Sequence, residues 1–178
     1  ALSTVGDTVT VTMVASESTQ SPDVTIGGTI ATVTGSGTTW TAVRALTADD
    51  TEGAVTLAID YLDLAGNAGA QATATTDGSV VTFDKTVPTF TSVSMASNNA
   101  NTALAMVGDI VTVTMVSNES TQAPDVTIGD SLGTVTGSGT TWTAVRALTA
   151  DDTEGSITLS IDYLDLAGNA GEQITATT

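Results

Sequence analysis

The 178-residue chain contains no cysteine and no histidine, and basic and aromatic residues are scarce. Zinc, copper, haem and iron–sulfur sites therefore lack their usual ligands here. Thiol catalysis and histidine-dependent catalysis lose their nucleophile and their base. We expect the protein not to be an enzyme, and we expect its fold to be held without any covalent cross-link.

Charge of one sign dominates, because 20 acidic residues stand against 3 basic ones, for a net charge of -17. Such a surface repels nucleic acid phosphates and anionic membranes, so we expect neither as a partner. No apolar run is long enough to predict membrane insertion. An acidic surface attracts cations, and oxygen ligands favour calcium or magnesium over softer metals.

An internal repeat organises the chain. VGDTVTVTMV at Val5 returns as VGDIVTVTMV at Val107, and at this offset of 102 residues 61 of 76 aligned positions are identical. A period near 100 residues indicates independent domains in series. We predict repeat 1 over residues 1–76, and a linker, a first strand and the remainder of repeat 2 over residues 77–178.

Residues 77–102 have no counterpart ahead of repeat 1, so that repeat lacks its first strand. One interpretation is that a fragment boundary cuts through a repeat. The other is that a strand from a neighbouring chain completes repeat 1 by edge-strand addition. Both interpretations stay open at the level of sequence.

Alternating apolar and polar residues predict strands and no helix of comparable strength. Asp7–Val14 alternates strictly, and Ala54–Tyr61 does the same with Gly-, Asn- and Ser-rich segments between such runs. The spacing favours an all-β fold of tandem immunoglobulin-like β-sandwich domains with Greek-key antiparallel sheets. In repeat 2 we expect strands at 89–96, 109–116, 124–128, 132–136, 140–147, 156–163 and 172–178.

In such a sandwich, the linker and two loops of repeat 2 meet at one pole. Asp84, Glu119 and Asp165 lie on these segments, and their carboxylates would repel one another unless a cation sits among them. Calcium takes six to eight oxygens. We predict a calcium site at the three acids, with the Asn118 or Asn169 side chain as a further ligand.

A second acidic cluster and an inward-facing arginine need separate explanations. TADDTEG begins at Thr47 and again at Thr149, and we expect it at the opposite pole, either as a solvated turn or facing the next repeat. Alternation from Trp142 turns Arg146 inward, which requires either a β-bulge or an acidic partner.

Several motifs resemble one family. DLAGNAG at Asp63 and Asp165, FDKTVPT at Phe83–Thr89 and SVSMASNNA at Ser92–Ala100 are similar to the bacterial immunoglobulin-like repeats of giant secreted surface and biofilm adhesins. The resemblance implies an extracellular extender region at the bacterial cell surface, with calcium at repeat junctions and neighbouring repeats as partners. By the same resemblance, Glu17 and Asp63 are weaker candidates for junction ligands, because repeat 1 has no linker Asp equivalent to Asp84.

Three functions remain in competition. A structural spacer gains length by duplication, so near-identical copies favour it. A ligand-binding adhesive module would need a distinctive surface, but the mismatches between the repeats cluster only at Gly28–Ala31 against Asp130–Gly133 and are otherwise scattered. A self-assembling filament or surface-layer subunit would use homotypic strand complementation of repeat 1.

Overall fold

The computed structural model describes residues 1–177, which form strands and no helix. It follows that this part of the chain has no helix able to cross a membrane. The chain forms two compact units, Ala1–Lys85 (unit 1) and Thr86–Thr178 (unit 2). This division differs from the expected boundary at residue 76, because residues up to Lys85 pack with repeat 1.

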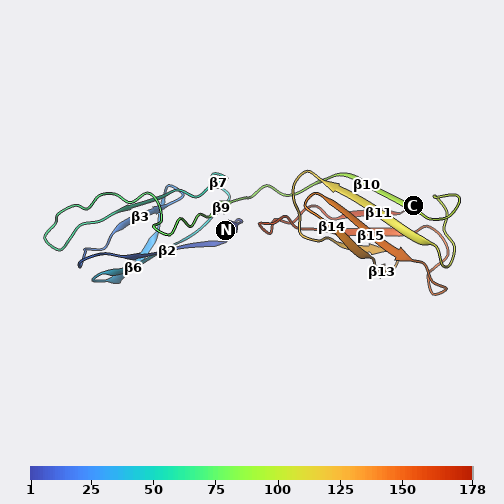
Figure 1. The fold of residues 1–178 in the computed structure, drawn as a ribbon, viewed down its shortest axis with the longest axis horizontal. Coiled ribbons are helices and arrows are strands. Elements are labelled where there is room, and N and C mark those ends of the chain that lie inside the picture. Colours follow the sequence, from blue (N-terminus) through green and yellow to red (C-terminus); the bar gives the residue numbers. More distant parts are fainter. Residues whose placement is uncertain (178) are drawn as a thin grey trace. The chain divides into compact units, whose positions relative to one another are not determined.

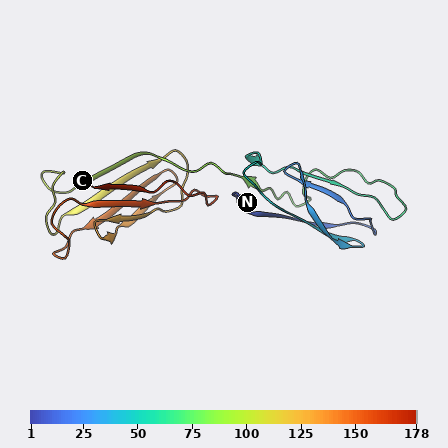
Figure 2. The same cartoon turned by 180° about the vertical axis from the view of Figure 1, so that it is seen from behind.

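The sandwich of unit 2 has two antiparallel four-stranded sheets, ordered β10-β11-β15-β14 and β13-β12-β16-β17. Figure 1 shows the first sheet, and Figure 2 shows the red C-terminal strands of the second. This order, with the chain passing between sheets, is the immunoglobulin arrangement. The strands are β10 (Phe90–Ser97), β11 (Ile110–Ser117), β12 (Asp125–Ile128), β13 (Ser131–Leu132), β14 (Thr134–Ser138), β15 (Thr141–Ala147), β16 (Thr158–Asp162) and β17 (Ile174–Thr177).

These strands lie close to the expected ones, with one difference. The expected strand 132–136 is divided at Gly133, because β13 pairs with β12 in one sheet and β14 pairs with β15 in the other. Thr178, expected in the last strand, lies outside the described residues.

The core of unit 2 follows from the alternation along β11. Val111, Val113 and Met115 are buried, while Thr114 between them is exposed. Burying such a side chain stabilises the fold by about 1.5–3 kcal/mol. The buried cluster consists of Val111, Val113, Met115, Val126, Ile128, Trp142, Ala144, Leu159, Ile161 and Tyr163.

Unit 1 repeats part of this arrangement in three three-stranded sheets, ordered β2-β6-β5, β4-β3-β8 and β1-β9-β7. The strand β9 runs parallel to β1 and antiparallel to β7, which is why the linker begins only after it. The strands are β1 (Leu2–Ser3), β2 (Thr8–Val14), β3 (Asp23–Ile26), β4 (Thr29–Ile30), β5 (Thr32–Ser36), β6 (Thr39–Ala45), β7 (Gly53–Ala54), β8 (Leu57–Asp60) and β9 (Thr82–Phe83).

Two strands of unit 2 have no counterpart strand in unit 1 among residues 1–177. No strand pairs with the edge of β2 where β10 lies on β11 in unit 2. Where β16 pairs with β17, unit 1 has only an isolated bridge between Ile59 and Ala72, with alanine in place of Ile174. As a result, the side chains of Met13, Ile59 and Tyr61 are only partly buried.

Candidate metal centre

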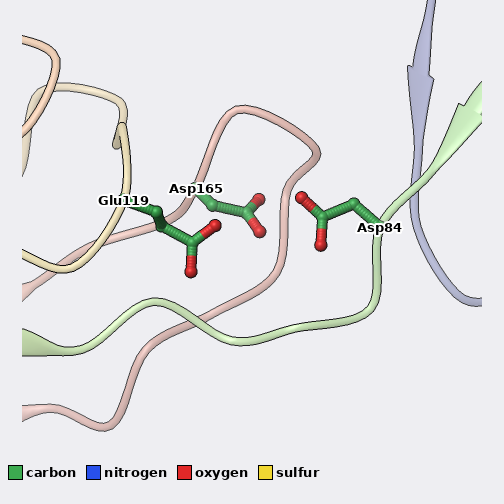
Figure 3. Close-up of side chains that lie close together, drawn as sticks. All are labelled: Asp84, Glu119 and Asp165. Carbon is green, nitrogen blue, oxygen red and sulfur yellow. The ribbon is translucent and has the colours of Figure 1, made fainter. Parts of the chain in front are cut away.

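Three carboxylates, one on the linker and two on loops of unit 2, lie close together. Each of Asp84, Glu119 and Asp165 offers an oxygen within 4.8 Å of the others, and Figure 3 shows the three groups directed toward one another. Asp84 directly follows β9, Glu119 lies on the loop after β11, and Asp165 lies on the loop between β16 and β17. The structure thus brings together the three acids that the sequence placed at one pole.

Asp165 is the most firmly held of the three, with 1% of its surface exposed. Its Oδ1 accepts hydrogen bonds from the backbone N–H of Gly168 at 2.6 Å and of Asn169 at 2.8 Å, and its Oδ2 accepts one from Asn169 Nδ2 at 2.7 Å. A carboxylate has about four acceptor positions. These three donors fix the orientation of the side chain.

The two asparagines named as possible ligands hold the site in place. The Oδ1 of Asn118 accepts a hydrogen bond from Thr89 N at 2.8 Å, and the backbone N–H of Asn118 donates to Thr89 O at 2.9 Å. The amide nitrogen of Asn169 is directed to Asp165. In the structure these amides are engaged in positioning the linker and the Asp165 carboxylate.

The electrostatics of the cluster favour a cation. Two carboxylates about 4.8 Å apart repel by roughly 1 to 3.5 kcal/mol, depending on the effective dielectric constant. Lys85, next to Asp84 in the sequence, directs its ammonium group to carbonyl oxygens of Ala48 and Asp50 in unit 1. An all-oxygen donor set with three negative charges suits a hard divalent ion, calcium above all.

The counterparts in unit 1 are not assembled in this way. Glu17 is exposed, and neither it nor Asp63 belongs to a group of three acids in the part of the chain that the structure describes. Asp63 keeps the local loop, because Asn67 donates to it from its backbone at 2.8 Å and from its side chain at 2.7 Å. These hydrogen bonds hold the pKa of Asp63 below its ordinary value. Among the described residues, a site at Glu17 and Asp63 would therefore have no third acid.

The second acidic cluster holds the first part of the linker. Lys85 N donates to Glu52 Oε1 at 2.7 Å, and Lys85 Nζ donates to Ala48 O at 2.7 Å and to Asp50 O at 2.9 Å. From the sequence we predict either a solvated turn or a surface that faces the next repeat. The recurrence of TADDTEG marks the cluster in the sequence, but it does not indicate Lys85 as the partner.

The inward-facing arginines have acidic partners. Arg44 Nη2 lies 2.7 and 2.8 Å from the two carboxylate oxygens of Asp50, and Arg146 makes the equivalent ion pair with Asp152. The Thr47 N–H and the Arg44 guanidinium outweigh burial and keep the pKa of Asp50 below its ordinary value. The pKa of Asp152 is lowered likewise by Thr149 and Arg146. The expected acidic partner of Arg146 is therefore Asp152.

Comparison with known proteins adds little to this geometry. No family model matches the chain, and no curated protein matches it. Among solved structures, the Bacteroides ovatus mixed-linkage glucan utilization locus SGBP-B, in complex with a mixed-linkage heptasaccharide, is similar at 17% identity and a TM-score of 0.26. The alignment covers 99% of this chain and 41% of that one. A likeness at this TM-score carries no argument about function.

Proposed function

We propose that the chain is a structural extender from an extracellular bacterial surface adhesin of the immunoglobulin-like repeat type, stiffened by calcium bound at Asp84, Glu119 and Asp165. The convergence of these three carboxylates carries the proposal. The acids come from the linker and from two loops of unit 2, so an ion bound to all three would tie the linker to that unit.

The way the linker is held supports this role. Lys85 is hydrogen-bonded within unit 1, and Thr89 is hydrogen-bonded to Asn118 of unit 2. Only residues 86–88 lie between these anchors, and Pro88, which is buried, has a fixed φ angle. Because so few backbone dihedrals of the linker are free, an ion that joins Asp84 to Glu119 and Asp165 would make the linker stiff.

The chief competitor is a ligand-binding adhesive module. The near-identity of the two copies argues against it, because duplication adds length but no new recognition surface. An extender needs only length, which duplication supplies. The acidic composition also agrees with an extender at the cell surface, because an acidic chain attracts cations and is repelled by anionic membranes.

Calcium titration with matched variants tests the proposal. Asp165→Asn removes a ligand, whereas Asp63→Asn makes the same change in the same loop of unit 1, which has no third acid. We expect calcium to raise the thermal stability of the protein and of Asp63→Asn, and to have at least about ten-fold lower apparent affinity for Asp165→Asn. Affinity in the submillimolar to millimolar range is typical of extracellular modules.

Small-angle scattering with and without chelator tests the mechanical part. We expect chelation to reduce the mean maximum dimension, because the linker is released and the carboxylates repel. If calcium binds but the dimension is unchanged, the site does not stiffen the linker. If calcium does not bind at all, the proposal fails at the site itself.

A further inference from the structure

The strands β2 of unit 1 and β11 of unit 2 are equivalent in sequence, but β11 has a strand on both sides and β2 lies at the edge of its sheet. In unit 2, β10 runs antiparallel along β11, with Val93 opposite Met115 and Met95 opposite Val113. In unit 1, the corresponding edge of β2 has no strand beside it among residues 1–177. Unpaired N–H and C=O groups along a strand edge are a template for an added strand.

A cleft of about 790 Å³ opens beside this edge in unit 1. It is lined by apolar side chains from both sheets, among them Val11, Met13, Trp40, Leu57, Ile59 and Tyr61. All six counterparts in unit 2 are buried, and Phe90, Val93 and Met95 of β10 pack against them. In unit 2 these side chains and Ile174 of β17 cover the equivalent core, whereas in unit 1 the segment from Ala72 to Ser79 lines the open cleft.

We propose that unit 1 is a strand acceptor, whose cleft binds one extended segment with the sequence pattern of β10, antiparallel to β2. The repeat offset fixes the register. The valine of the incoming strand lies opposite Met13 and its methionine opposite Val11. Its phenylalanine packs on Tyr61, as the ring of Phe90 packs on that of Tyr163 at a centroid distance of 4.3 Å. Main-chain hydrogen bonds give affinity, and alternate side chains give specificity.

The donor is an extended segment with the sequence pattern of β10 that belongs to no folded sheet, and not β10 of a second copy. In each copy, β10 is already paired along β11, and its apolar side chains lie against the core of unit 2. Withdrawing β10 from the donor copy would expose there the same apolar core surface that β10 covers in the acceptor. A segment that has no sheet of its own bears no such cost, and its binding requires no calcium.

Peptide binding to the full chain tests the proposal. The probe is a synthetic peptide with the sequence of residues 87–99, and the control peptide carries serine in place of Val93 and Met95. Trp40, which lines the cleft, reports binding by fluorescence in a Trp142→Phe background. We expect saturable one-to-one binding, an affinity for the control peptide lower by about ten-fold or more, and loss of binding in Met13→Glu.

A fusion provides a second measurement that does not depend on peptide solubility. Because residue 103 is equivalent to residue 1, placing a copy of residues 87–102 directly before Ala1 recreates the connection found in unit 2. We expect the unfolding midpoint of unit 1 to rise toward that of unit 2. Failure of the peptide to bind and of the fusion to stabilise would overturn the acceptor role. Dimers of the chain that the peptide cannot displace would overturn the assignment of the donor.

Discussion

A matched pair of methionine substitutions measures how much the open edge of unit 1 matters for stability. Met13 and Met115 occupy equivalent positions in β2 and β11, and each lies opposite a tryptophan of the neighbouring strand. Met115 is fully buried in β11, which has β10 beside it, whereas Met13 is partly exposed in the cleft. Met115→Ala removes a buried side chain and leaves a cavity, and Met13→Ala only enlarges a space that solvent already reaches.

The expected magnitudes follow from this difference. Truncating a fully buried methionine costs about 2 to 5 kcal/mol, and we expect about 3 kcal/mol for Met115→Ala. With a urea slope of about 1.5 kcal/mol per molar, this moves the midpoint of unit 2 by about 2 M. For Met13→Ala we expect unit 1 to lose about 1 kcal/mol of stability, because the partly exposed Met13 side chain gains only part of its transfer free energy on folding.

Urea unfolding followed by tryptophan fluorescence separates the two units, since Trp40 lies in unit 1 and Trp142 in unit 2. Each methionine variant is compared with a reference that carries the same single tryptophan, with Trp142→Phe or Trp40→Phe as background. Equal losses for the two substitutions would refute the reasoning, because the cleft would then have no energetic consequence. Addition of the β10 peptide should raise the cost of Met13→Ala.

Two further predictions concern pH and backbone conformation. The folded-state pKa values of Asp50 and Asp152 lie below their ordinary ones, so their ion pairs stabilise the fold above about pH 4 and this contribution is lost as pH falls through the folded values. Acid titration by circular dichroism should show a less acid-sensitive stability in Arg44→Met than in the parent, and an identical pH dependence would contradict this. Gly137→Ala should destabilise unit 2 by more than about 1 kcal/mol, because its φ is +134° and a Cβ would lie 2.3 Å from Thr141 O. Gly78→Ala, at φ +73° with open space around it, is the control in thermal melts and should cost less.

Much of the fold could be predicted from the sequence because its strongest signals are local. Alternation in β11 and β16 depends only on which side chains face the core, and the repeat offset carries each assignment to the other copy. The three acids of the candidate site could be named for a related reason. Once an immunoglobulin topology is accepted, it places the linker and two loops at one pole whatever residues lie between them.

The remaining features depend on contacts between segments that share no pattern. Nothing in the sequence indicates that Thr82–Phe83 pairs with Leu2–Ser3, or that Lys85 binds the TADDTEG turn. The hydrogen bonds of Asn118 and Asn169 also needed coordinates, because the side-chain amide of asparagine can donate and accept. Asn118 Oδ1 accepts a hydrogen bond from Thr89 N, and Asn169 Nδ2 donates one to Asp165 Oδ2.

The double anchoring of the linker has a mechanical consequence. Three residues between fixed points extend to about 10 Å at most, so pulling on the chain meets almost no slack. Tension would load the hydrogen bonds of Lys85 and Asn118 before it reaches either core. An array of such modules would then yield first at its connections, which can re-form, while the sandwiches stay folded.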